Sequence, residues 1–171
     1  MSRPLAIPLA ALVALAGALD ATSARADDAT CKPVSEAMAK LASTPYHETA
    51  VVNGKPFEKI YTTTALYIGS GGRWMKTPAT PQTLNDASRE SGLSFSNCKS
   101  LRTEAVDGQA ATVYAAHSQT TTPAFGSDAQ IWIGANGLPL RSESDVPTGP
   151  GKGHTSTRMA YDNVHAPAGV N

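Results

Sequence analysis

The stretch of residues 131–145, IWIGANGLPLRSESD, decides the fold class. Ile131 and Ile133 flank Trp132, which is the period-2 pattern of a half-buried strand. Asn136-Gly137 supplies two residues that tolerate a positive φ, as a two-residue hairpin turn requires. Charged residues then recur at every second position over 141–145, so one face of the return strand is expected to be solvent-exposed. The stretch therefore predicts an antiparallel hairpin with one dry face.

The alternation also assigns side chains to the two faces of that hairpin. If Ile131 and Ile133 face the interior, Trp132 points to the opposite face of the sheet. We expect Trp132 to be the exposed aromatic residue of its strand in that case. An exposed tryptophan would favour a surface for protein interaction over a ligand cavity.

Similar turn signals recur along the chain. Asn53-Gly54, the glycines of residues 69–72 and Asp107-Gly108 separate runs that are rich in β-branched and aromatic residues. They predict about eight or nine short strands joined mostly by tight turns. Strands joined in this way form an antiparallel meander, and a twisted sheet of this size tends to curl into an open barrel.

Two helices are expected beside this sheet. Apolar residues recur at i, i+3, i+4, i+7 and i+8 from Val34, which predicts an amphipathic helix over 32–43, with Pro33 in its first turn. Residues 78–92 contain a second, short helix capped by Thr80, which we expect to cover the sheet rather than build the core. The fold class is therefore α+β: a curved antiparallel sheet forming an open half-barrel, with helices on its concave side.

The first 26 residues predict a secretory signal peptide. A basic start precedes the uncharged, mostly apolar run of residues 4–19, and Ala24-Arg25-Ala26 is a small-x-small cleavage site. Cleavage after Ala26 leaves residues 27–171 as a single domain, located in the periplasm, without a membrane span. That domain has 12 Lys and Arg against 13 Asp and Glu, a formal charge of −1. No basic excess supports nucleic-acid binding.

Two cysteines, Cys31 and Cys98, are present in the whole sequence. In an exported protein a single disulfide between them is the favoured interpretation. They form no CxxC redox motif and are too few for a structural zinc site.

Motifs of catalysis are absent from the sequence. The four histidines do not pair at metal-ligand spacing, so no metal site is predicted. No GxSxG nucleophile motif occurs, and residues 149–156 lack the spacing of a phosphate-binding loop. We predict that the protein is not an enzyme and needs no cofactor. A small hydrolase would require a Ser or His gathered with a carboxylate in one cleft.

The C-terminal third resembles the closing strands of the LolA/LolB-like periplasmic lipoprotein-carrier superfamily. The resemblance rests on Gly137-Leu138-Pro139-Leu140, the charged return strand of 141–145 and the aromatic-Asp/Asn ending of 161–164. The hairpin of residues 66–76, LYIGSGGRWMK, and the early amphipathic helix are also similar to that family. The resemblance implies an incomplete barrel whose concave face is covered by helices and binds acyl chains or other amphiphiles.

Together these observations predict a soluble, non-catalytic periplasmic protein that holds a lipid, an acyl chain or another amphiphile between sheet and helix. The alternative is a cell-envelope interaction module, with a protein partner, a solid core and no ligand cavity. A filled interior would favour the module. The residues expected to line the ligand site are Met38, Leu41, Tyr61, Trp74, Tyr114 and Trp132.

Overall fold

The computed structural model describes residues 24–148 and 151–170, which form two helices and nine strands. The helices are α1 (Ala24–Leu41) and α2 (Pro81–Glu90). The strands are β1 (Tyr46–Val52), β2 (Lys55–Tyr61), β3 (Ala65–Ser70), β4 (Arg73–Pro78), β5 (Ser94–Val106), β6 (Gln109–Thr121), β7 (Ala124–Gly134), β8 (Pro139–Thr148) and β9 (Gly151–Ala160).

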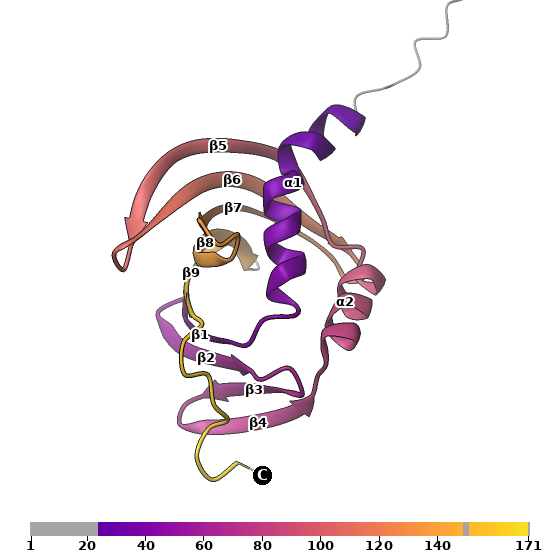
Figure 1. Ribbon diagram of the computed structural model, residues 1–171. Coiled ribbons are helices and arrows are strands. Elements are labelled where there is room, and N and C mark those ends of the chain that lie inside the picture. Colours follow the sequence, from indigo (N-terminus) through magenta and orange to yellow (C-terminus); the bar gives the residue numbers. More distant parts are fainter. Residues whose placement is uncertain (1–23, 149–150, 171) are drawn as a thin grey trace, which may run out of the picture.

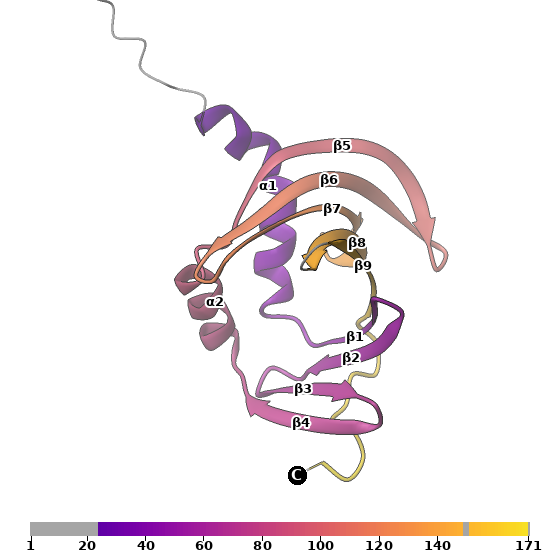
Figure 2. The same ribbon diagram turned by 180° about the vertical axis from the view of Figure 1, so that it is seen from behind.

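The strands form one antiparallel sheet in the order β4-β3-β2-β1-β9-β8-β7-β6-β5. The sheet curls around α1, while its two edge strands β4 and β5, both within the described residues, are not paired with each other (Figures 1 and 2). The predicted fold class, an α+β open half-barrel with helices on its concave side, is therefore confirmed. Pairing of β1 with β9 joins the first four strands to the last five, a long-range contact that no local turn signal encodes.

Helix α2 carries the chain from β4 across the open side of the barrel to β5 (Figure 1). Thr80 caps it as predicted: its hydroxyl accepts from the Thr83 backbone N–H, and the Thr83 hydroxyl accepts from the Thr80 N–H in return. No residue of α2 is buried. The helix is thus a cover across the mouth of the barrel rather than a core element.

The first helix begins earlier than the sequence predicts. It starts at Ala24 instead of residue 32, so Pro33 lies inside it rather than in its first turn. Proline lacks the N–H that would donate to the carbonyl of Ala29, and helices bend at such positions. The first turns of α1 accordingly lie at an angle to the rest of the helix in Figure 1. Most of the signal peptide predicted for residues 1–26 lies outside the described residues.

The hairpin between β7 and β8 differs from the predicted two-residue turn. Only Gly137 has a positive φ, of 74°. The Gly137 N–H donates to the Gly134 carbonyl and the Gly134 N–H donates to the Leu138 carbonyl, which makes a three-residue loop. The side chain of Asn136 accepts from the Leu138 N–H, so its role is a side-chain hydrogen bond and not a second positive φ.

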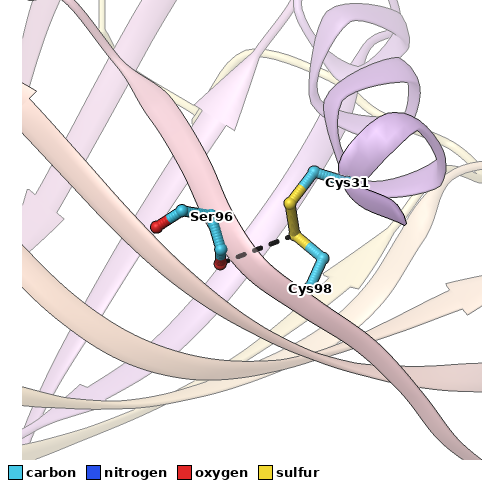
Figure 3. The surroundings of a disulfide bond; sticks show 3 residues. All are labelled: Cys31, Ser96 and Cys98. Atoms are coloured by element: carbon cyan, nitrogen blue, oxygen red, sulfur yellow. Dashed lines mark hydrogen bonds between the residues drawn. A yellow bond between two sulfur atoms is a disulfide. The ribbon is translucent and has the colours of Figure 1, made fainter. Parts of the chain in front are cut away.

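The main core lies between α1 and the concave face of β5–β7. Val34 at the centre of α1 is fully buried, which contributes about 2 kcal/mol to the free energy of unfolding. A disulfide joins Cys31 of α1 to Cys98 of β5, as predicted (Figure 3). It holds the middle of the helix against β5, an edge strand of the sheet. The buried cluster comprises Cys31, Val34, Ala37, Cys98, Ala116, Ile131 and Ile133.

Trp132 lies on the outer face of the sheet, opposite to the isoleucines, but it is buried. The expectation of an exposed aromatic residue is wrong, since only 2% of Trp132 is accessible. The long β5–β6 hairpin curls over this face, and Val106 near its tip packs in the same cluster as Trp132. Arg141 also covers the ring, with its guanidinium 4.6 Å from the ring centre.

The segment after β9 covers the outer face at the other end of the barrel. Val164 and Val170 pack there against a buried cluster of Ile60, Ala65 and Tyr67. Within residues 24–148 and 151–170, neither helix combines the length and the apolar character that crossing a bilayer requires.

Candidate functional site

Six small side chains gather on the concave face of three neighbouring strands. Ala116 of β6 lies opposite Ala129 of β7, which in turn lies opposite Ser144 of β8. These positions share their face with Ile131, which packs against α1. A helix crossing side chains this small cannot fill the space beneath it. The six residues, called here the small-residue patch, are Ala116, Ser118, Ser127, Ala129, Ser142 and Ser144.

A chamber of about 220 Å³ lies between α1 and the small-residue patch. A dry apolar cavity of about 150 Å³ is enough to bind benzene, so the chamber has room for an apolar group of that size or a little more. Among the described residues, no charged side chain lines it. The rest of its wall consists of Met38, Leu93, Phe95, Ile131, Pro139 and Met159.

Three serines of the patch, Ser118, Ser127 and Ser142, are compatible with an apolar occupant because their hydroxyl groups bond to hydroxyls on the neighbouring strand. The Ser118 and Ser127 hydroxyl oxygens are 3.1 Å apart, and Ser142 lies 2.6 Å from the Thr157 hydroxyl. A paired hydroxyl needs no partner from the ligand. Three of the four patch hydroxyls are thus paired, and the chamber presents mostly methyl and methylene groups.

The chamber continues into a larger groove, called here the mouth groove, between α1, α2 and the start of β5. This groove has a volume of about 680 Å³, within the usual range for small-molecule sites. Met38, Leu93 and Phe95 line both spaces and so mark the passage between them. The remaining wall of the mouth groove is mostly polar: Cys31, Ser35, Ala39, Gln82, Asn85, Ser88, Arg89 and Ser94.

A third hollow, of about 350 Å³, lies between the end of α1 and α2. Met38, Leu41 and Tyr46 are part of its wall. Burial, together with the charge of Glu48 and the neighbouring Tyr61, raises the pKa of Tyr46. Its phenol therefore stays protonated at neutral pH and offers a neutral hydroxyl, not a base.

Four of the six predicted site residues lie on the concave side of the sheet. Met38 lines all three hollows and Leu41 lines the third. Tyr61 is fully buried in a cluster with Leu41 and Tyr46, behind the wall of the third hollow. Tyr114 packs in the layer between α1 and the sheet. These four are brought together around α1.

Both tryptophans lie away from the chamber. Trp132 is on the outer face, where its indole N–H donates to Glu104 at 2.5 Å. Trp74 packs on the outer face of β3, where a Cβ at Gly69 would lie 2.9 Å from its ring. The sequence prediction favoured large aromatic residues as cavity lining, whereas small residues make the wall of the chamber. The available signal was Ala or Ser at two successive inward positions on each of three strands.

Three of the four histidines, His47, His117 and His154, pair with carboxylates on the outer face of the sheet. His117 Nδ1 lies 2.8 Å from Asp128, and His154 Nδ1 lies 3.0 Å from Asp145. In residues 24–148 and 151–170, no serine hydroxyl is hydrogen-bonded to either ring, and no three metal-ligating side chains come together. Among the described residues, the histidine–carboxylate pairs thus lie on the face opposite to the chamber.

No protein-family model and no curated protein sequence matches this chain. Solved structures are similar to it at low identity. The lipoprotein LppX of Mycobacterium tuberculosis has 14% identity over 81% of this chain and 98% of its own, with a TM-score of 0.49. LprF of Mycobacterium bovis has 12% identity over 84% and 96%, with a TM-score of 0.47. The hypothetical lipoprotein YmcC of Escherichia coli has 12% identity over 70% and 88%, with a TM-score of 0.36.

Proposed function

We propose that this chain is a non-catalytic binding protein of the cell envelope, which holds the apolar part of a lipid or another amphiphile between its curved sheet and α1. The observation that carries the proposal is the uncharged chamber beneath Met38, which opens into a polar groove. The apolar chamber suits the tail of an amphiphile, and the polar groove suits its headgroup. A solid core, which an interaction module would have, does not account for this space.

Binding would draw on burial of the apolar chain, at about 25 cal/mol for each Å² removed from water. The disulfide between Cys31 and Cys98 supports an oxidising compartment, since such bonds persist mainly outside the cytoplasm. The N-terminal sequence favours the same location. We therefore place the mature protein in the periplasm as a soluble carrier.

Filling the chamber tests the proposal. Ala129 lies at the centre of the small-residue patch, so Ala129→Phe would place a ring in the space that the ligand needs. Ala115 is the matched control, because it lies on the neighbouring strand and lines a shallow hollow that contains the outward-facing His154 and Asp145. Ala115→Phe adds the same ring to the other face of the sheet.

The measurement is lipid mass spectrometry of organic extracts from purified protein, followed by titration with a fluorescent fatty-acyl probe. Wild type and Ala115→Phe should carry co-purified amphiphiles and bind the probe, while Ala129→Phe should do neither. Unfolding curves check that both variants are folded. Equal probe binding by all three proteins, or none by the wild type, would contradict the proposal.

A further inference from the structure

Among the described residues, the lining of the mouth groove carries one formal charge. Arg89, in the last turn of α2, is the single ionisable residue among those that line it, since Cys31 is in the disulfide. None of the described residues that line the chamber is charged. An ionic headgroup therefore cannot lie in the chamber without a large desolvation cost and has its one opposite charge at Arg89.

The Arg89 side chain is 74% exposed and retains hydrogen-bonding capacity beyond its ion pair with Asp86. One guanidinium nitrogen donates to Asp86, one turn earlier in α2, and Asp86 also accepts from the amide of Gln82 at 3.0 Å. A guanidinium has five N–H donors, so those not used by Asp86 are available to a carboxylate or phosphate. The uncharged polar residues of the groove wall, such as Asn85 and Ser88, can bond to the remaining oxygens of a headgroup.

The volumes limit the apolar part of the ligand. The chamber measures about 220 Å³ against about 680 Å³ for the mouth groove. The narrower space is inside and the wider one is at the mouth, so the site accommodates one tail and a bulky head rather than several tails side by side.

We propose that the ligand is a single-chain amphiphile with an anionic headgroup, its tail in the chamber and its carboxylate or phosphate beside Arg89. This inference rests on the proposed function and narrows it to a class of ligand. Asp86 already binds the Arg89 guanidinium. An incoming anion must therefore share the guanidinium with Asp86 or displace Asp86 from it.

Calorimetric titration with defined lipids tests the inference. The probes are laurate, lauroyl lysophosphatidylglycerol and lauroyl lysophosphatidylcholine, which share one chain and differ in headgroup charge and type. The wild type should bind the two anionic probes about three- to fivefold more tightly than the lysophosphatidylcholine, and the preference should fall with added salt. Laurate and the lysophosphatidylglycerol separate a carboxylate from a phosphate as the preferred anion.

Three variants separate a local contact from a general charge effect. Arg89→Gln should remove the preference for anionic probes and leave binding of the lysophosphatidylcholine unchanged. Asp86→Asn should increase the preference because it frees Arg89. Lys32→Gln is the matched control: Lys32 also forms an ion pair within a helix, with Glu36 at 3.7 Å, but does not line the mouth groove. It should behave as wild type.

Each contrary result has a distinct meaning. Equal binding of all three probes by the wild type, or equal losses from Arg89→Gln and Lys32→Gln, would overturn the role of Arg89. Tighter binding of dihexanoyl phosphatidylglycerol, which divides the same number of acyl carbons between two chains, would overturn the single-chain assignment. Failure of every probe to bind would instead overturn the proposed function itself.

Discussion

Ala129 of β7 lies directly opposite Ala116 of β6 on the face of the sheet that α1 covers. The next inward pair along the same strands is Ile131 and Tyr114, whose side chains do reach the helix layer. The chamber therefore results from the size of a few side chains and not from a missing element of structure. A protein that needed only a stable core would gain by filling it.

Replacing Ala129 by leucine should raise the free energy of unfolding and weaken ligand binding at the same time. The added side chain fills existing space, and such substitutions commonly contribute about 1 kcal/mol. Urea unfolding and acyl-probe titration of the same variant measure the two effects. Ala115→Leu, on the outer face, should change neither appreciably. A marked loss of stability in Ala129→Leu would show that the space beneath α1 is already filled.

Loss of the disulfide should lower stability substantially. The bond between Cys31 and Cys98 closes a loop with a sequence separation of 67, which corresponds to about 4 kcal/mol on the chain-entropy model. Urea unfolding of the wild type should therefore shift on addition of dithiothreitol, whereas a Cys31→Ser, Cys98→Ser double variant should be insensitive to it. An unchanged midpoint of the wild type under reduction would refute this prediction.

Tyr61 and Tyr161 should respond oppositely to removal of their hydroxyl groups. The Tyr61 hydroxyl is buried without a hydrogen-bond partner among the described residues, so Tyr61→Phe should raise stability by about 1 kcal/mol. The Tyr161 hydroxyl donates to the Pro139 carbonyl, so Tyr161→Phe should lower stability by about the same amount. Chemical denaturation of both variants provides the comparison, and a loss of stability in Tyr61→Phe would mean that its hydroxyl has a partner.

Glu104 should make stability depend on pH in the acid range. A hydrogen bond from the Trp132 indole, followed by one from Arg102, holds the pKa of Glu104 below its ordinary value. The contribution of such a group is complete above the pKa of the unfolded chain and is lost as the pH falls through the folded-state value. The stability difference between wild type and Glu104→Gln should therefore shrink from about pH 6 to about pH 3.

A Trp74→Phe background leaves Trp132 as the one tryptophan of the described residues and lets its fluorescence report the same titration. The emission of Trp132 should change with pH in the protein that keeps Glu104 and stay constant in the Gln variant. The same pH dependence in both proteins would show that another group is responsible.

Local signals in the sequence were sufficient for much of the fold. Asn53-Gly54 and Asp107-Gly108 have the positive φ values that their hairpins require, and Thr80 caps α2 as predicted. The start of α1 was missed because Pro33 is tolerated in a first turn and is equally found at a bend. The pairing of β1 with β9 depends on the whole sheet and leaves no local pattern.

The candidate site was predicted less completely, for a physical reason. Alternation placed Trp132 correctly opposite Ile131 and Ile133, but its burial depends on the β5–β6 hairpin folding over the outer face. Helical periodicity identified Met38, which lines every part of the cavity. The small-residue patch has weak hydrophobicity and no distinctive chemistry, so its function as a cavity wall appears only when α1 is placed above it.

The most direct test of the central claim is to locate the ligand's tail by cross-linking. A fatty acid with a diazirine at the end of its chain is bound, irradiated and mapped by fragment mass spectrometry. We expect labels on residues that line the chamber, including Met38, Ile131 and Met159, and their loss in Ala129→Phe. Labels confined to the outer face around Trp74 or Trp132, or labelling that Ala129→Phe leaves unchanged, would contradict it.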